Sequence, residues 1–313
     1  MSDTYRNLLV GIELESARDG KGLSPTADSS AAWARALDLA KAHQASLCAM
    51  HVLDMDPLAR TWAERQGEGS GTWIGEAKVA LARLVAEAKQ RGCEARSLVH
   101  FGKPVEKISE VAKDQGHDLV IVGSRRPSSG MTVYALRGVL LGTTASKLLH
   151  LCPTPVWIVR PHAPRPYARI VVATDLTPLG ERVLAHAARI AKLDGSTLHV
   201  LHAIDTWFAG RGWLFGPAQA TIQHELERRL TEARSKLAHQ VASTLDRMGI
   251  ATPPVTYLEI MAPEELILRI ARVENADLVA LGTAARTGVP GFFVGNTCER
   301  ILPELACALL VVR

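Results

Sequence analysis

Several residues near the C-terminus have the types and the spacing of a phosphate-binding loop. The stretch LGTAARTGVPGFFVGNT begins at Leu281, contains four glycines and ends in Asn-Thr. Gly282 frees the backbone to turn where an apolar strand ends, and Asn296 or Thr297 could cap the helix that follows. Uncapped amides and the helix dipole attract anions, and Arg286 could reach a phosphate. Glycines and a cap also serve any strand–loop–helix connection, so the stretch alone does not establish a phosphate site.

A carboxylate and an alanine are expected at the same edge of the fold. Asp175 closes the apolar run IVVATD, and Ala203 follows the run LHVLHA. A carboxylate at a strand end could accept hydrogen bonds from an adenine or a ribose. It could equally cap the helix that begins near Pro178. Both interpretations of Asp175 stay open at the level of sequence.

The chain repeats itself, and the repeat explains how these residues are positioned. Four blocks recur in the same order: 7–16 with 169–178, 47–54 with 198–205, 101–124 with 260–283, and 154–160 with 307–313. The segment 160–169 contains three prolines, which cannot continue a strand or a helix. We therefore expect two domains, residues 1–160 and 167–313.

Each half alternates apolar runs with amphipathic stretches. In the first half, the runs 8–12, 46–52, 96–100, 119–122 and 156–159 are typical of strands buried on both faces. Helical spacing of apolar residues occurs in 33–40 and 77–88, and again over 222–245. This alternation predicts an α/β fold with two doubly wound, Rossmann-like domains in tandem, each with a five-stranded parallel sheet. Ligands in such folds bind beyond the carboxyl ends of the strands.

Composition excludes several classes of protein. The net charge is +4 with no long run of Lys or Arg, which argues against nucleic-acid binding. The five cysteines form no metal-ligand spacing or disulfide framework, so we predict no metal site and a reducing compartment. No apolar signal core or membrane-spanning stretch is present, and we expect a cytoplasmic protein. His51, His199 and His202 are expected to be structural histidines.

Taken together, these residues resemble the universal stress protein family, many of whose members bind ATP. The family signature is a glycine, two residues, a second glycine, nine residues, and then Gly-Ser or Gly-Thr. The second half keeps this spacing with Gly282, Ala285 and Gly295-Asn296. Asp175 falls on the family's aspartate and Ala203 on its small apolar position. The resemblance implies a nucleotide site whose residues are Asp175, Ala203, Gly282, Ala285, Arg286, Gly295, Asn296 and Thr297.

The first half departs further from this signature. Arg126 stands in place of the second glycine, and the distance from Gly123 to Gly142 is 19 residues, against 13 from Gly282 to Gly295. The insertion and the longer Glu13 side chain are expected to spoil a standard ATP pocket. Arg125 and Arg126 could hold an anion or merely solvate a loop. The counterparts of the nucleotide site in this half are Glu13, Val52, Gly123, Gly142 and Thr143.

The resemblance covers nearly the whole chain and is strongest to tandem, E-type members. It implies a stress-response ligand-binding protein with ATP, AMP or a related nucleotide in the C-terminal domain, and Mg only as a companion of that nucleotide. The apolar final strands predict that the halves meet as an intramolecular pseudo-dimer, and a dimer of tandems is the alternative.

Other functions remain open beside nucleotide binding. The aromatic segment from Trp207 to Phe215 suggests a lipid-like ligand or a protein partner. A slow ATPase is a further alternative, although no catalytic residue and no Walker or GxSxG motif is recognised.

Overall fold

The computed structural model of the chain describes residues 4–17, 22–55, 61, 65, 72–124, 143–161, 163, 165–204, 219–283 and 296–313. These residues fall into two compact units, one within residues 4–163 and the other within 165–313.

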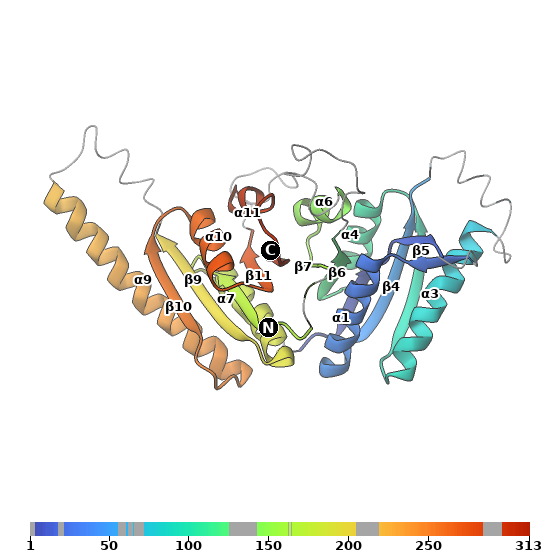
Figure 1. Cartoon of the computed structure of the whole chain (residues 1–313), viewed down its shortest axis with the longest axis horizontal. Coiled ribbons are helices and arrows are strands. Elements are labelled where there is room, and N and C mark those ends of the chain that lie inside the picture. Colours follow the sequence, from blue (N-terminus) through green and yellow to red (C-terminus); the bar gives the residue numbers. More distant parts are fainter. Residues whose placement is uncertain are drawn as a thin grey trace. The chain divides into compact units, whose positions relative to one another are not determined.

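The first unit alternates strands and helices along the chain (Figure 1). Its main elements are β1 (Asn7–Gly11), α1 (Ala27–His43), β4 (Ser46–Leu53), α3 (Trp73–Gln90), β5 (Ala95–Phe101), α4 (Pro104–Asp114), β6 (Leu119–Gly123), α6 (Thr143–Leu151) and β7 (Val156–Val159). The strands follow the order β7-β6-β1-β4-β5, and every neighbouring pair is parallel. The chain therefore reverses its direction of winding at β1, as a doubly wound sheet requires.

The second unit repeats this plan (Figure 1). It consists of β8 (Arg169–Ala173), α7 (Pro178–Asp194), β9 (Thr197–Ile204), α9 (Gln219–Met248), β10 (Val255–Ile260), α10 (Pro263–Val273), β11 (Leu278–Gly282), α11 (Asn296–Ile301) and β12 (Ala308–Val312). Its strand order is β10-β9-β8-β11-β12, again with parallel neighbours. The predicted α/β class with five parallel strands in each half is confirmed. Within each unit the final strand is outermost, and its pairing across the halves stays a prediction.

One feature of the first unit was not anticipated. Between β1 and α1 the chain forms a small antiparallel sheet of β2 (Leu14–Ser16) and β3 (Leu23–Pro25). In the second unit only four residues separate β8 from α7. Strands β2 and β3 have three residues each, too few for a clear strand period, so sequence reasoning did not find the hairpin.

The central strands are buried along their length because helices cover both faces of the sheets. Leu8, Leu9 and Val10 in β1 have no exposed surface, and the same holds for Ile170, Val171 and Val172 in β8. Helix α9 is the contrasting element: its 30 residues expose many charged side chains, and only one side packs on the unit. None of the helices in the described ranges has a stretch apolar and long enough to cross a membrane.

A single carboxylate secures the start of the central strand in each unit. Asp118 Oδ2 accepts hydrogen bonds from the amides of Arg6 and Asn7, at 2.6 and 2.9 Å. Asp277 Oδ2 accepts from the amides of Ala168 and Arg169, at 2.7 and 3.0 Å. In both cases the amide of the aspartate donates back to the first residue of the strand, at 2.9 Å. The aspartate therefore sets the register between two neighbouring strands.

We predict that Asp277→Ala lowers the free energy of unfolding of the chain by about 2 kcal/mol, because two backbone amides lose a charged acceptor. Asp277→Asn keeps an acceptor oxygen and should cost less than half of this. Chemical denaturation followed by circular dichroism measures both. Asp246→Ala, which removes an exposed carboxylate from α9, is the control. Equal stability of the Asp277→Ala and Asp246→Ala proteins would contradict the assigned role.

Candidate functional site

Each unit has a cavity at the carboxyl edge of its sheet, where the winding direction changes. The cavity in the first unit measures about 440 Å³, and that in the second about 170 Å³. Both lie where the sheet order predicts ligand binding. The volume of the cavity in the first unit is within the usual range of small-molecule sites. The cavity that the described residues form in the second unit is below this range and has room for a smaller chemical group.

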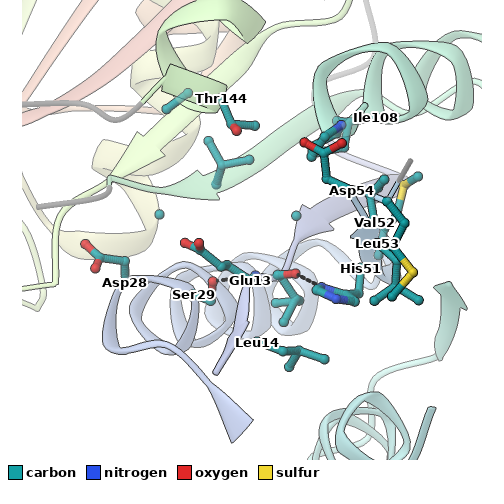
Figure 2. A pocket seen from close by; sticks show the side chains of 18 of the residues that line it. Glu13, Leu14, Asp28, Ser29, His51, Val52, Leu53, Asp54, Ile108 and Thr144 are labelled. Carbon is teal, nitrogen blue, oxygen red and sulfur yellow. Dashed lines mark hydrogen bonds between the residues drawn. The ribbon is translucent and has the colours of Figure 1, made fainter. Parts of the chain in front are cut away.

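The cavity of the first unit has apolar walls and several oxygen-bearing side chains (Figure 2). Val52, Leu53 and Ile108 provide apolar surface. The carboxyl groups of Glu13 and Asp28 lie toward one side, and that of Asp54 lies near Ile108. Three of the predicted first-half residues, Glu13, Val52 and Gly123, line this cavity. Thr143 begins α6 but its side chain is outside the described part of the chain, as are Arg125, Arg126 and Gly142.

The first-half pocket was expected to be spoiled for a standard nucleotide, yet the described residues enclose the larger of the two cavities here. Leu14, the first residue of the hairpin strand β2, also lines this cavity, so the insertion after Glu13 forms part of its wall.

The cavity of the second unit brings together four of the predicted nucleotide residues. Asp175, Ala203, Gly282 and Thr297 all line it. The backbone of Asn296 begins α11, but its side chain is outside the described residues, and so are Ala285, Arg286 and Gly295. The aromatic segment from Trp207 to Phe215 is likewise not described.

Asp175 both faces the cavity and supports a helix cap. Its Oδ1 accepts hydrogen bonds from the amide of Thr177 at 3.0 Å and from the Thr177 hydroxyl at 2.6 Å. Thr177 is the N-cap of α7, and its Oγ1 accepts from the amide of Leu179 at 3.2 Å. The two interpretations of Asp175 are therefore compatible. One carboxylate oxygen holds the cap, and within the described residues no group bonds the other.

A histidine next to each cavity bonds a backbone carbonyl of the neighbouring strand end. His51 Nδ1 donates to the carbonyl of Ile12, and His202 Nδ1 donates to that of Thr174, both at 2.8 Å. Burial lowers the pKa of His51, so its ring is neutral at pH 7 and Nε2 is an acceptor. Each histidine therefore makes one structural hydrogen bond, and each also lines its cavity. Each fixes the residue that precedes the acidic side chain, Glu13 or Asp175.

Sequence reasoning gave the wrong physical reason for the glycine that ends β11. Gly282 was expected to free a sharp turn, but its φ is not positive. A Cβ at this position would lie 2.8 Å from Cγ of Leu179 in the first turn of α7. At Gly123 a Cβ would lie 2.5 Å from the backbone carbonyl of Asp28 in the first turn of α1. Both glycines thus allow a helix to approach the strand closely, which positions the residues at the cavity.

Some residues of the sites were not found from sequence. Asp28 and Trp73 line the first cavity, and Thr174 and Gly180 line the second. The repeated blocks 47–54 and 198–205 did contain a signal for one pair of site residues, because His51 and His202 occupy the same position in the two blocks. No cluster of three or more His, Cys, Asp or Glu side chains within the described ranges is arranged to hold a metal ion.

Comparison with known proteins identifies the family. The sequence model of the universal stress protein family matches residues 4–160 and again residues 166–313. The chain therefore belongs to the universal stress protein family and carries two tandem copies of its domain.

Two known relatives are similar over most of this chain. Universal stress protein E of Escherichia coli K12 is 26% identical over 227 residues, which cover 69% of this chain and 67% of that protein. A universal stress protein of Mycolicibacterium smegmatis is 25% identical over 305 residues, 93% of this chain and 95% of its own length.

Solved structures agree on the fold. A functionally unknown protein from Pseudomonas aeruginosa PAO1 aligns with a TM-score of 0.65 and 21% identity, covering 99% of this chain and 93% of its own. A universal stress protein from Archaeoglobus fulgidus aligns with a TM-score of 0.63 and 17% identity, covering 98% of each chain.

The two glycines provide a matched test of helix–strand approach. Gly123→Ala should lower the free energy of unfolding by about 3 kcal/mol, because its methyl group meets rigid backbone. Gly282→Ala should cost only about 1 kcal/mol, because the Leu179 side chain can rotate away. Thermal unfolding midpoints of the two variants measure the difference. A smaller loss in Gly123→Ala than in Gly282→Ala would contradict this packing.

Proposed function

We propose that the protein is a stress-response ligand-binding protein whose second unit binds an adenine nucleotide. The observation that carries this proposal is the position of Asp175. It lies at the end of the central strand, beside the cavity, with one carboxylate oxygen that no described residue bonds. That oxygen can accept a hydrogen bond from a ribose hydroxyl or from an amino group of a base.

The walls of this cavity suit a flat heterocycle. Ala173, Ala203 and Gly282 are small and leave room beside the sheet edge, while Ile267 and Leu281 offer apolar surface. A base bound there would bury its faces against apolar side chains and present its polar edge to Asp175. Most of the lining is thus apolar, with a small number of polar groups for orientation.

The phosphates are proposed to lie toward the segment between β11 and α11. The resemblance to the family implies this direction, with Ala285, Arg286, Gly295, Asn296 and Thr297 as the phosphate side. Thr297 lines the described cavity and supports the assignment. Occupancy would be communicated to a partner, as a stress-response role requires. We expect the protein to act in the cytoplasm.

The second unit is the better candidate for an anionic ligand. In the described walls, Asp175 is its single carboxylate, whereas three carboxylates line the cavity of the first unit. Helices α1 and α7 can be aligned at their N-caps, Thr26 and Thr177. Two residues after the cap, the first unit has Asp28 and the second has the uncharged Leu179. Fewer negative charges reduce the repulsion of a phosphate.

We predict that AMP and ATP bind the chain and that Asp175→Asn weakens the binding of AMP about tenfold. Asparagine keeps an acceptor oxygen for Thr177, but an NH2 group replaces the oxygen that faces the ligand. This group donates and cannot accept, so one hydrogen bond to the ligand is lost. Isothermal titration calorimetry measures the affinities. Glu13→Gln in the first unit is the matched control and should leave the affinity unchanged.

The absence of any heat change at millimolar AMP and ATP would overturn nucleotide binding. Native mass spectrometry of the purified chain separates the alternatives. A co-purified adenylate supports the proposal, and a lipid-sized adduct supports an apolar-ligand module instead. Turnover of ATP that is lost in Asp175→Asn would indicate a slow ATPase.

A further inference from the structure

One side chain of helix α9 spans the turn that carries Asp175. Gln240 Oε1 accepts a hydrogen bond from the hydroxyl of Thr174 at 2.6 Å. Its Nε2 donates to the backbone carbonyl of Thr177 at 3.1 Å. The amide of Gln240 thus bonds the residue that follows β8 and the residue that caps α7, with Asp175 between them.

The bonded turn has a backbone that is uncommon for its residues. Leu176 has a φ of +60°, in the left-handed region that a side chain with a Cβ rarely occupies. Its amide donates to Thr174 Oγ1 at 3.0 Å, so the same hydroxyl that bonds Gln240 also holds this residue. Strained backbone of this kind persists only where surrounding contacts determine it, and it occurs most often at ligand sites.

The neighbouring helix leaves room for this arrangement. A Cβ at Gly180 in α7 would lie 2.2 Å from Thr174 Oγ1 and 2.8 Å from Asp175 Oδ1. Glycine at this position is therefore required for Thr174 to reach Gln240. In the first unit the equivalent helix position is Ser29, whose own Oγ accepts from the amide of Glu13 at 2.8 Å. The two copies hold their acidic residue by different means, and the second relies on α9.

Helix α9 is bound to α7 at further points on the same side. Arg247 Nη1 pairs with Glu181 Oε1 at 2.8 Å, and Lys192 Nζ donates to the carbonyl of Met248 at 2.9 Å. These contacts lie one turn or more from Gln240 along α9, so they keep the helix in place without bonding the Asp175 turn. A substitution of Gln240 should therefore remove the hydrogen bonds to the Asp175 turn while these other contacts between α9 and α7 remain.

We propose that Gln240 is a positioning residue that holds the Asp175 turn in its ligand-binding conformation and couples occupancy of the second cavity to α9. This proposal rests on the proposed function, because it assigns Asp175 a ligand. Coupling is reciprocal: if the seating of α9 strengthens ligand binding, a bound ligand stabilises the seating of α9 to the same degree. The exposed face of α9 is then the part of the unit that responds to occupancy.

The experiment compares Gln240→Met, which keeps the length of the side chain and removes both hydrogen bonds, with His239→Met at the exposed neighbouring position. Hydrogen exchange of the free protein is measured at the amides of Leu176 and Thr177. Gln240→Met should accelerate exchange there about tenfold, and His239→Met should not. AMP should bind Gln240→Met about tenfold more weakly.

A double-mutant cycle distinguishes positioning from general stability. If Gln240 acts through Asp175, Gln240→Met should cause no further loss of AMP affinity in an Asp175→Asn protein. Additive losses would overturn the positioning role, as would unchanged exchange at Leu176 and Thr177. Faster exchange with full AMP affinity would also overturn it. If the unmodified chain binds no AMP, the proposed function falls, and the exchange data still decide whether Gln240 holds the turn.

Discussion

Each unit depends on one carboxylate that holds two successive backbone amides at the start of its central strand. Asp118 and Asp277 do this in the same way, and both also donate an amide back to that strand. The bonds align β1 with β6 and β8 with β11. Because a parallel strand has a fixed rise for each residue, alignment at one end determines which residues meet at the other. The cavities lie at that other end.

The two copies use this common frame to build different sites. In both, a glycine at the end of the fourth sheet strand admits the first turn of a helix, and a histidine bonds the carbonyl of the residue just after the central strand. The residues around these shared points differ. A hairpin follows Glu13, whereas a short strained turn follows Asp175. Gene duplication can therefore keep the contacts that define the fold while the contacts that define a ligand change.

Sequence reasoning was most successful where a signal repeats or has a strong period. The recurring blocks and the buried apolar runs predicted two parallel sheets of five strands. The resemblance to the family came from the spacing of the glycine signature together with Asp175 and Ala203. Asp175, Ala203 and Gly282 were placed together because strands of a parallel sheet end at one edge. The reasoning failed where the cause is a contact between segments far apart. Gly282 was assigned to a turn, although its lack of a Cβ serves the approach of Leu179. Gln240 has no sequence signal that distinguishes it from the other polar residues of α9.

The sequence by itself determined the α/β class, the duplication and the order of elements, because these follow from local periodicity and from comparison of one half with the other. Only the tertiary structure decided what each polar group near the cavities does. A hydrogen bond forms only if the distance between its two atoms is correct to within a few tenths of an ångström. The two residues can be more than 60 positions apart in the chain, as Thr174 and Gln240 are. Spacing along the chain carries no such information, since helix packing and strand register together set those distances.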